Sequence, residues 1–307
     1  MRDADHGYSL GPAHYLDGDG TRKVAYLNYD LLEEALVATQ ADAAWVGWGF
    51  VAEHPEFPTL CQRLGVTFIG PDATVMQQLG DKITSKRLAM AAGVPVAPWS
   101  EGDVASAAAA ARICEQLGYP VMIKATAGGG GRGIRRVDTP DELENAFAKA
   151  QAEARNAFGD GTMFIEKLVE HAKHIEVQVI GDTGGTVWPV GVRDCSVQRR
   201  NQKLLEEAPC PVLTAEEDDH IKQAAARMAR EAGYVGAGTV EFLYDPTSGS
   251  FSFMEVNARL QVEHPITEVT TGLDLVKMQL HVAQGGLLVG DPPQTLGHAI
   301  EARLNAE

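Results

Sequence analysis

Acidic and amide side chains are concentrated in the stretch EFLYDPTSGSFSFMEVNARLQVEHP, which begins at Glu241. Apolar and polar residues alternate on both sides of the DPTSG turn, and this pattern predicts two paired β-strands. Successive side chains on a strand alternate between its two faces, so Glu255 and Asn257 point the same way. If Tyr244 pairs with Ser252, Glu241 lies directly opposite Glu255.

A metal site would account for this arrangement. Facing carboxylates destabilise a sheet, and a divalent cation removes their repulsion. Two carboxylates and one amide suit Mg²⁺ or Mn²⁺ carried in with substrate phosphates, so we predict Glu241, Glu255 and Asn257 as metal ligands. The alternative is an edge hairpin with a solvated acidic face. The metal site is favoured by four polar residues in the short run that follows: Arg259, Gln261, Glu263 and His264.

A second polar segment, VMIKATAGGGGRGIR, begins at Val121 and predicts a strand followed by a glycine loop. Glycine lets the backbone approach a ligand closely, so successive amides can surround a phosphate, and Lys124 would add positive charge. The spacing matches neither the P-loop nor the dinucleotide fingerprint. On the glycines alone, a flexible surface loop is an equal alternative, and the flanking basic residues favour a phosphate lid. The loop glycines are Gly128, Gly129, Gly130 and Gly131.

Composition limits the class of protein. The 307 residues are enough for roughly two domains, and 45% hydrophobic and 22% charged residues are typical of a globular protein. No segment is long and apolar enough to cross a bilayer, and the start, MRDADHGYSL, lacks signal-peptide features, so we expect a cytoplasmic protein. The net charge of −16 opposes binding to nucleic acid and to anionic membranes. Four scattered cysteines, Cys61, Cys114, Cys195 and Cys210, indicate reduced thiols.

Helix and strand patterns alternate along the chain and predict an α/β and α+β protein. The first unit is a parallel-sheet pattern with helices at 31–39 and 57–64 and strands at 43–46 and 66–69. A helix through residue 92 and a turn at Gly93 follow. The second unit has helices at 106–117 and 140–158 and strands at 121–124 and 163–167. The third has strands at 175–180 and 186–192, a helix at 217–232, the hairpin, and a helix after Asp274.

Several short motifs occur in order along nearly the whole chain. They are GDK at Gly80, KATAGGGGRG at Lys124, EK at Glu166, HIEVQV at His174, RDCSVQRRNQKLLEEAP at Arg193, GAGTVEF at Gly236, FMEVNARLQVEHPITE at Phe253 and EARLNAE at Glu301. Together they resemble the biotin carboxylase component of biotin-dependent carboxylases, in the ATP-grasp superfamily. The segment WVGWG at Trp45 resembles the form in large acetyl-CoA carboxylases.

The resemblance implies an ATP-grasp fold in three parts. Residues 1–80 would form a partial amino-terminal domain with a parallel sheet. Residues 81–168 would form a lid subdomain with the glycine loop, and residues 169–307 the catalytic domain and the start of an incomplete carboxyl-terminal mixed-sheet domain. The chain begins after the first strand and helix of the family and ends before the rest of its last domain, so we expect a truncated chain.

The resemblance also implies a reaction. In this family ATP phosphorylates bicarbonate to carboxyphosphate, which gives CO₂ and phosphate; the phosphate deprotonates the ureido nitrogen of biotin, which captures the CO₂. The implied cofactors are ATP and Mg²⁺ or Mn²⁺, with two metal sites. Biotin on a carrier domain is the implied substrate, and a carboxyltransferase of an acetyl-CoA carboxylase in fatty acid biosynthesis is the implied partner. A homodimer is implied if the missing carboxyl-terminal part is present.

The resemblance assigns roles to individual residues. Lys203 and Arg259 would anchor bicarbonate, Glu263 would take its proton, and Arg303 would stabilise negative charge on the ureido oxygen of biotin. Glu241, Glu255 and Asn257 would hold the metal ions. Glu166 and the backbone near Val169 would hold adenine. The full implied nucleotide set is Lys82, Lys124, Gly128, Gly129, Gly130, Gly131, Glu166, Lys167, Val169, His174, Gln198 and Asn201.

One residue departs from the family pattern, because Asn201 stands where histidine is usual. Both side chains form hydrogen bonds, so we expect at most a modest loss of nucleotide affinity. We expect Glu206 and Glu207, and His264 with Pro265, to form ion pairs and turns rather than to act in chemistry. Two other functions stay open: a carbamoyl-phosphate synthetase half, which shares bicarbonate phosphorylation, and a catalytically silent nucleotide-binding module.

Overall fold

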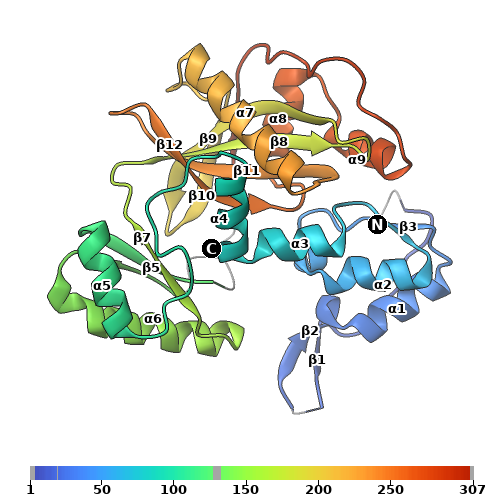
Figure 1. Cartoon of the computed structure of the whole chain (residues 1–307). Coiled ribbons are helices and arrows are strands. Elements are labelled where there is room, and N and C mark those ends of the chain that lie inside the picture. Colours follow the sequence, from blue (N-terminus) through green and yellow to red (C-terminus); the bar gives the residue numbers. More distant parts are fainter. Residues whose placement is uncertain (1–3, 19, 127–132, 305–307) are drawn as a thin grey trace.

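The computed structural model describes residues 4–18, 20–126 and 133–304. The described residues form an amino-terminal unit of helices, a small three-stranded sheet with two helices, and a large six-stranded sheet (Figure 1). Helices α3 and α4 run between these parts (Figure 1). This mixed α/β arrangement agrees with the predicted fold class.

The amino-terminal unit contains a two-stranded parallel sheet, as the alternating pattern predicted. Its strands are β3 (Ala43–Ala44) and β4 (Thr67–Phe68), and its helices are η1 (Ala25–Leu27), α1 (Tyr29–Ala38), η2 (Phe50–Glu53) and α2 (Glu56–Leu64). Phe57, Leu60 and Cys61 of α2 form its core. A hairpin of β1 (His14–Leu16) and β2 (Arg22–Val24), which the sequence did not predict, projects from this unit (Figure 1).

Two aspartates set the boundaries of the connecting helices α3 (Ala73–Gly80) and α4 (Lys82–Ala91). The Asp72 carboxylate accepts a hydrogen bond from the Val75 amide at 2.9 Å, and Asp81 accepts one from the Thr84 amide at 2.7 Å. Such side chains satisfy amides that have no partner at a helix start. The GDK motif therefore puts Lys82 at the first position of α4, and Lys86 lies one turn later on the same face.

The glycine-loop unit is an antiparallel sheet of order β6-β5-β7 with two helices packed on it. Its strands are β5 (Val121–Ala125), β6 (Ile134–Val137) and β7 (Met163–Lys167), and its helices are α5 (Ala107–Leu117), η3 (Pro140–Glu142) and α6 (Leu143–Phe158). Residues 98–104 run beside β7, because the Ser100 amide donates to the Ile165 carbonyl at 2.8 Å. We call this unit, with residues 98–104, the lid sheet.

The large sheet has the order β12-β11-β8-β9-β10-β13, and its neighbouring strands are antiparallel. Its strands are β8 (Lys173–Gly181), β9 (Val187–Arg199), β10 (Gln202–Ala208), β11 (Gly236–Asp245), β12 (Ser250–Asn257) and β13 (Ala299–Ala302). Its helices are α7 (Ala215–Glu231), α8 (His264–Thr271) and α9 (Leu275–Ala283). The sequence did not predict β10, β13 or α8, which begins at the residue expected to shape a turn, His264.

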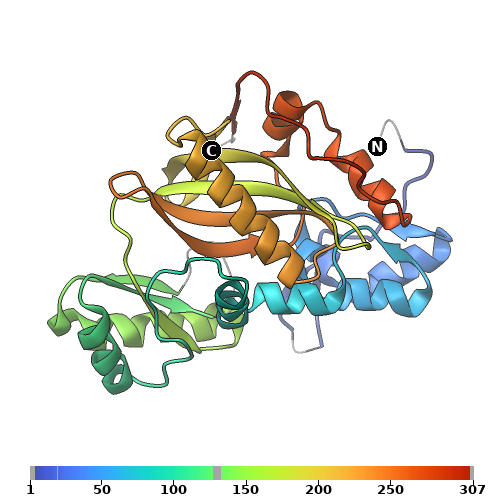
Figure 2. The same cartoon turned by 45° about the horizontal axis from the view of Figure 1, so that its top comes forward.

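The central strands of the large sheet have one apolar and one polar face. In β8, Ile175, Val177 and Val179 belong to the same buried core as α7, which crosses that face (Figure 2). His174, which precedes Ile175, and Glu176, which follows it, point to the opposite face, because strand side chains alternate. The motif HIEVQV therefore buries a core on one side and presents polar groups on the other.

The β11–β12 hairpin places Glu241 opposite Glu255, as predicted, but through a different register. Ser252 pairs with Leu243 instead of Tyr244, so the premise of the prediction was wrong. Met254 is left out of the pairing and forms a β-bulge. This extra residue shifts the register by one position, so that Glu241 pairs with Glu255.

Within the described ranges, no helix has the length and apolar composition needed to cross a membrane. All four cysteines lie in these ranges and are buried and free, which confirms the prediction of unpaired thiols.

Candidate active site

A cavity of about 1210 Å³ lies against the polar face of the large sheet, α4 and β5. It is lined by most of the residues predicted from the sequence: Lys82, Lys124, His174, Gln198, Asn201, Lys203, Glu241, Glu255, Asn257, Arg259, Glu263 and Arg303. The structure therefore brings together side chains from six strands, one helix, the turn between β9 and β10, the segment before α8 and the residue that follows β13.

Lys203 of β10 is the centre of this cluster. Its ammonium group donates to three buried carboxylates, at 2.5 Å to Glu176, 3.0 Å to Glu241 and 2.6 Å to Glu263. Burial opposes the charge on Lys203, but Glu176 and Glu241 outweigh it and raise the pKa of Lys203 above its usual range. The Lys203 ammonium is therefore fixed between Glu241 and Glu263, which line the cavity, and Glu176, which lies behind them.

His174 and Glu241 form a second close pair, with His174 Nε2 3.0 Å from Glu241 Oε2. Burial lowers and Glu241 raises the pKa of His174, and the net direction is upward. On the other ring nitrogen, Gln198 Nε2 lies 2.9 Å from His174 Nδ1. Gln198 also donates to the Cys195 carbonyl at 2.8 Å, so the amide fixes the orientation of the imidazole.

The donor set of the hairpin fits Mg²⁺ or Mn²⁺. Glu241 and Glu255 offer carboxylate oxygens, which are the ligands these ions prefer. Both acids are neutralised by protein cations, and Lys82 donates to Glu255 at 2.5 Å, so positive charge already gathers where a divalent ion would sit. Asn257 turns its amide nitrogen to Glu241 at 2.8 Å and its oxygen to Arg259 at 3.3 Å. Metal binding by Asn257 would therefore require its amide to rotate.

Glu263 lies between two cations at the end of the cavity. Its Oε1 accepts from Lys203, and its Oε2 accepts from Arg303 at 2.7 Å. Only 1% of Glu263 is exposed, so both hydrogen bonds are shielded from water. Arg303 also donates to Glu206 at 2.6 Å, which confirms the expected ion pair of Glu206. Glu263, the predicted base, and Arg303, the predicted stabiliser of the oxyanion, are thus in direct contact, and Glu263 also contacts Lys203.

Arg259 is held from two sides. Its Nε donates to Glu53 of η2 at 2.9 Å, and the Ala258 amide donates to the other Glu53 oxygen at 3.2 Å. Glu53 thus links the amino-terminal unit to the segment before α8 and sets the direction of the guanidinium.

Three predicted nucleotide residues are outside the lining of this cavity: Glu166, Lys167 and Val169. Glu166 of β7 is buried, with Oε2 2.8 Å from Lys86 and Oε1 in contact with Lys124. The Lys167 ammonium donates to the Gly118 and Tyr119 carbonyls at 3.0 and 2.9 Å, so this side chain is engaged within the lid sheet. The predicted loop residues Gly128, Gly129, Gly130 and Gly131 lie outside the described residues.

Asn201 lies in a tight turn between β9 and β10. Arg199 pairs with Gln202, so Arg200 and Asn201 form a two-residue hairpin loop in which both residues have positive φ, 53° and 63°. Such tight loops favour asparagine, which tolerates this conformation better than most residues. The turn aligns β10 and so places Lys203 next to Glu176.

Sequence reasoning missed two fully buried members of the site, Glu176 and Arg193. Arg193 donates to Glu176 at 2.6 Å, to Gln178 at 2.8 Å and to Thr267 at 2.9 Å. Glu176 lies in the motif HIEVQV and Arg193 begins the motif RDCSVQRRNQKLLEEAP, and the signal for Glu176 was a charged residue between the apolar residues Ile175 and Val177 of a strand. They form a layer beneath Lys203 that fixes the carboxylate to which it binds.

Comparisons with known proteins agree with this geometry. Residues 1–76 match the family model described as "Biotin carboxylase, N-terminal domain", and residues 81–289 match "Carbamoyl-phosphate synthase L chain, ATP binding domain". Biotin carboxylase 2 of Bacillus subtilis is 43% identical over 308 residues, which are 100% of this chain and 69% of that protein. The chain belongs to the biotin carboxylase family.

Other similar proteins support the assignment to the biotin carboxylase family. A pyruvate carboxylase subunit from Methanothermobacter thermautotrophicus is 47% identical over 100% of this chain and 61% of its own length. The biotin carboxylase domain dimer of 2-oxoglutarate carboxylase from Hydrogenobacter thermophilus, solved with MgADP, ADP and bicarbonate, has 45% identity and a TM-score of 0.89. It aligns with 92% of this chain and 63% of its own. This biotin carboxylase family member thus has the ATP-grasp fold and spans about three fifths of these two relatives.

Glu301 gives this family member a pH-dependent contribution to stability. It pairs across β10–β13 with Glu206, and burial, with Glu206 and Glu263 adding, raises the pKa of Glu301 to about 7 from 4.5. The folded state therefore binds this proton more tightly than the unfolded state. The resulting stabilisation is complete below about pH 4.5 and is lost as the pH rises through 7.

We therefore expect Glu301→Gln to raise the free energy of unfolding at pH 8 and to change it little at pH 5. The gain at pH 8 is about 1 kcal/mol, reduced from the full shift because Glu301 is partly exposed. Urea unfolding at the two pH values measures it, with Glu34→Gln on the exposed face of α1 as the control. Equal effects of Glu301→Gln at both pH values would contradict this linkage.

Proposed function

We propose that the chain carboxylates biotin on a carrier protein in a reaction that uses ATP and bicarbonate and proceeds through carboxyphosphate. The observation that carries this proposal is the continuous chain of contacts from Glu241 through Lys203 and Glu263 to Arg303 in one cavity. Lys203 is a cation for an anionic substrate, Glu263 is a buried acid beside it, and Arg303 is a second cation next to Glu263. The proposed reaction needs these groups in this order.

Binding of MgATP is supported by the cations on one side of the cavity. Lys82, Lys124 and His174 line it, and nucleotide phosphates require such local charge in a chain of net charge −16. Mg²⁺ or Mn²⁺ held by Glu241 and Glu255 would neutralise charge on the transferring phosphoryl group. The complex of MgADP with the relative from Hydrogenobacter thermophilus supports this part of the proposal.

Bicarbonate would bind between Lys203 and Arg259. Glu241, as a ligand of a divalent ion, would hold the Lys203 ammonium less tightly, and this ammonium group would then be available to bind an anion. Glu263 would take the bicarbonate proton, and the oxygen left behind attacks the γ-phosphorus of ATP with ADP as the leaving group. Carboxyphosphate then breaks into CO₂ and phosphate. Positioning and charge neutralisation account for most of the catalysis in such transfers.

Biotin would approach at the Arg303 end. Phosphate takes the proton from its ureido nitrogen, and this nitrogen bonds to the carbon of CO₂. The guanidinium of Arg303 would stabilise the negative charge that forms on the ureido oxygen. Arg303 is 2.7 Å from Glu263, so the site that releases CO₂ and the site that captures it are adjacent.

Several finer assignments belong to this proposal. We divide the chain into residues 1–80, 81–168 and 169–307, and we assign the predicted residues the roles given above. The partners are a biotin carrier domain and a carboxyltransferase, with a second copy of the chain as in the dimeric relative. Two of the relatives described above are named as parts of a pyruvate carboxylase and of a 2-oxoglutarate carboxylase, so acetyl-CoA as the final acceptor stays a prediction. Action in the cytoplasm is supported by the four free thiols.

The test is release of ADP by the purified chain with Mg²⁺ and ATP, with and without bicarbonate and free biotin. We expect release that requires bicarbonate and rises with biotin. Carbamoyl phosphate formed from added ammonia, without stimulation by biotin, would favour the carbamoyl-phosphate synthetase alternative. MgATP binding with no bicarbonate-dependent release would contradict the proposed reaction and favour a silent nucleotide-binding module.

A further inference from the structure

Lys86 is a buried cation to which neither the sequence motifs nor the proposed reaction assign a role. Only 3% of it is exposed, and its ammonium lies 2.8 Å from Glu166 Oε2. The same ammonium is 5.8 Å from the ring centre of Trp99 and 6.0 Å from that of Phe164. A lysine taken out of water in this way is costly unless it is paired, so its contact with the Glu166 carboxylate matters.

Glu166 is shared by two cations that differ in what surrounds them. Both lysines line the large cavity, but Lys86 binds Oε2 beside Trp99 and Phe164 with its side chain 3% exposed, whereas Lys124 binds Oε1 with its side chain 17% exposed. Burial raises the pKa of Glu166, but Lys124 and Lys86 outweigh it and lower the pKa to about 2. Glu166 is therefore ionised with both lysines in place, and its buried charge would be costly without a cation beside it.

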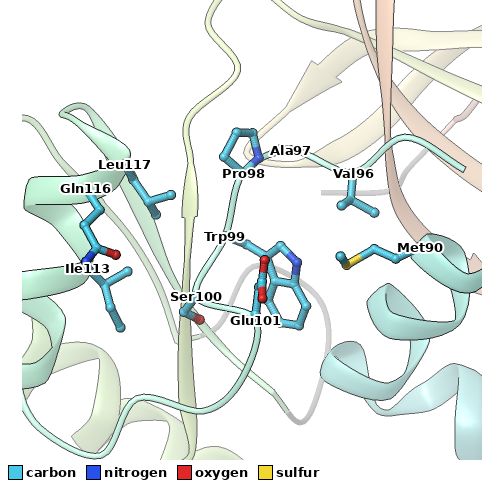
Figure 3. Close-up of a pocket in the computed structure, with 10 residues that line it drawn as sticks. All are labelled: Met90, Val96, Ala97, Pro98, Trp99, Ser100, Glu101, Ile113, Gln116 and Leu117. Atoms are coloured by element: carbon cyan, nitrogen blue, oxygen red, sulfur yellow. The ribbon is translucent and has the colours of Figure 1, made fainter.

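The pair of Lys86 and Glu166 also joins two parts of the molecule. Lys86 is on α4, which packs with the core of the large sheet, whereas Glu166 is on β7 of the lid sheet. Trp99 lies at this joint: its backbone bridges to Glu166, and its indole lies between α4 and α5 beside a second cavity (Figure 3). The contacts of this joint with Glu166, Trp99 and Phe164 hold Lys86 in place at the wall of the large cavity.

We propose that Lys86 is a positioning residue for nucleotide binding, which stays paired with Glu166 so that Lys124 can leave Glu166 and bind the nucleotide polyphosphate. This inference rests on the nucleotide binding in the proposed function. An ammonium group cannot neutralise a buried carboxylate and a polyphosphate equally well at once. With Lys86 present, Glu166 keeps one cation when Lys124 moves. Without it, departure of Lys124 would leave a buried charge unpaired, and Lys124 would be retained on Glu166.

The test compares a nucleoside with its triphosphate. Calorimetry gives the dissociation constants of adenosine and of MgATP for the wild type and for Lys86→Met, which keeps the length of the side chain and removes the charge. We expect the ratio of adenosine to MgATP dissociation constants to fall roughly 10- to 100-fold in Lys86→Met. The control is Arg87→Met, because Arg87 is the next residue of α4 and is exposed, and it should leave the ratio unchanged.

The ratio separates positioning from general damage. A merely structural role of Lys86 would weaken adenosine and MgATP equally and leave the ratio unchanged, which would overturn the inference. If the wild type binds neither ligand, the proposed function fails together with this inference. If the wild type binds both and Lys86→Met keeps the wild-type ratio, only the role of Lys86 fails.

A second variant decides the matter if Lys86→Met does not fold. Lys86→Met/Glu166→Gln removes both charges of the buried pair, which proteins often tolerate. Lys124 then has no carboxylate to hold it, so we expect a ratio within about threefold of the wild type. A ratio reduced as far as that expected for Lys86→Met alone would overturn the inference.

Discussion

Lys203→Met is expected to lower bicarbonate-dependent ADP release by at least about 10³-fold. The reason is the position of Lys203 between Glu176, Glu241 and Glu263. Without its ammonium, these acids repel one another, and bicarbonate loses the cation that would orient it. The variant removes both substrate positioning and the charge that fixes Glu263, so the loss should appear in kcat as well as in kcat/KM.

Two further variants make this result specific. Lys222→Met removes a lysine whose ammonium pairs with Asp218 one turn away on α7, and it should keep wild-type turnover. Lys203→Arg keeps the charge, but a planar guanidinium cannot direct its donors to three acids as the ammonium does, so we expect a loss of at least about 10²-fold. Turnover of Lys203→Met within tenfold of the wild type would contradict the assignment of Lys203.

Arg193→Met should cause the largest loss of stability among single substitutions at the site, about 3–5 kcal/mol. Arg193 has no exposed surface, and its guanidinium donates to Glu176, Gln178, Thr239, Thr267 and Gln261. Burial lowers the pKa of Arg193, but Glu176 and Glu263 outweigh it, so the cation stays charged. Replacing it with methionine leaves the Glu176 carboxylate buried with one cation fewer and removes hydrogen bonds from four neutral partners.

Urea unfolding measures this loss as a lower midpoint with an unchanged slope. Arg63→Met is the matched control, because the Arg63 side chain is 61% exposed and its pair with Glu33 is screened by solvent, so the variant should change stability little. The double variant Arg193→Met/Glu176→Gln should recover part of the loss, because it also removes the unpaired acid. A loss below about 1 kcal/mol in Arg193→Met would show that Glu176 is compensated by Lys203 alone.

The sequence predicted the parts of the fold that depend on local alternation. In HIEVQV, apolar and polar residues alternate strictly, so both the buried face and the face with His174 and Glu176 follow from the period of a strand. The parallel pairing of β3 and β4 follows from helices between short strands. The facing position of Glu241 and Glu255, the two predicted metal ligands, was found by the same logic, although the predicted register differs from the observed one by the bulge at Met254.

Contacts between distant residues were not predictable in this way. The turn before β10 contains no glycine, so Arg200 and Asn201 gave no hairpin signal, and β10 was missed. Lys86 looks like an ordinary helix residue, since its partner Glu166 comes from a strand 80 positions later. Glu53 likewise reaches Arg259 only in the folded chain. Burial and ion pairing of these residues depend on how the units pack, which no local pattern records.

The bulge at Met254 divides the β11–β12 hairpin into two halves, and the length of the outer half can change without a change in the pairing of the inner half. The outer half, from Phe242 around the turn to Phe253, is paired in one register, and the inner half with Glu241 and Glu255 in another. Gly249 in the turn has a φ of +69°, and the turn residues 246–248 face solvent. Insertions or deletions there can be absorbed without moving the two acids. The same change between Met254 and Asn257 would separate them, so the outer half can vary in length whereas the inner half cannot.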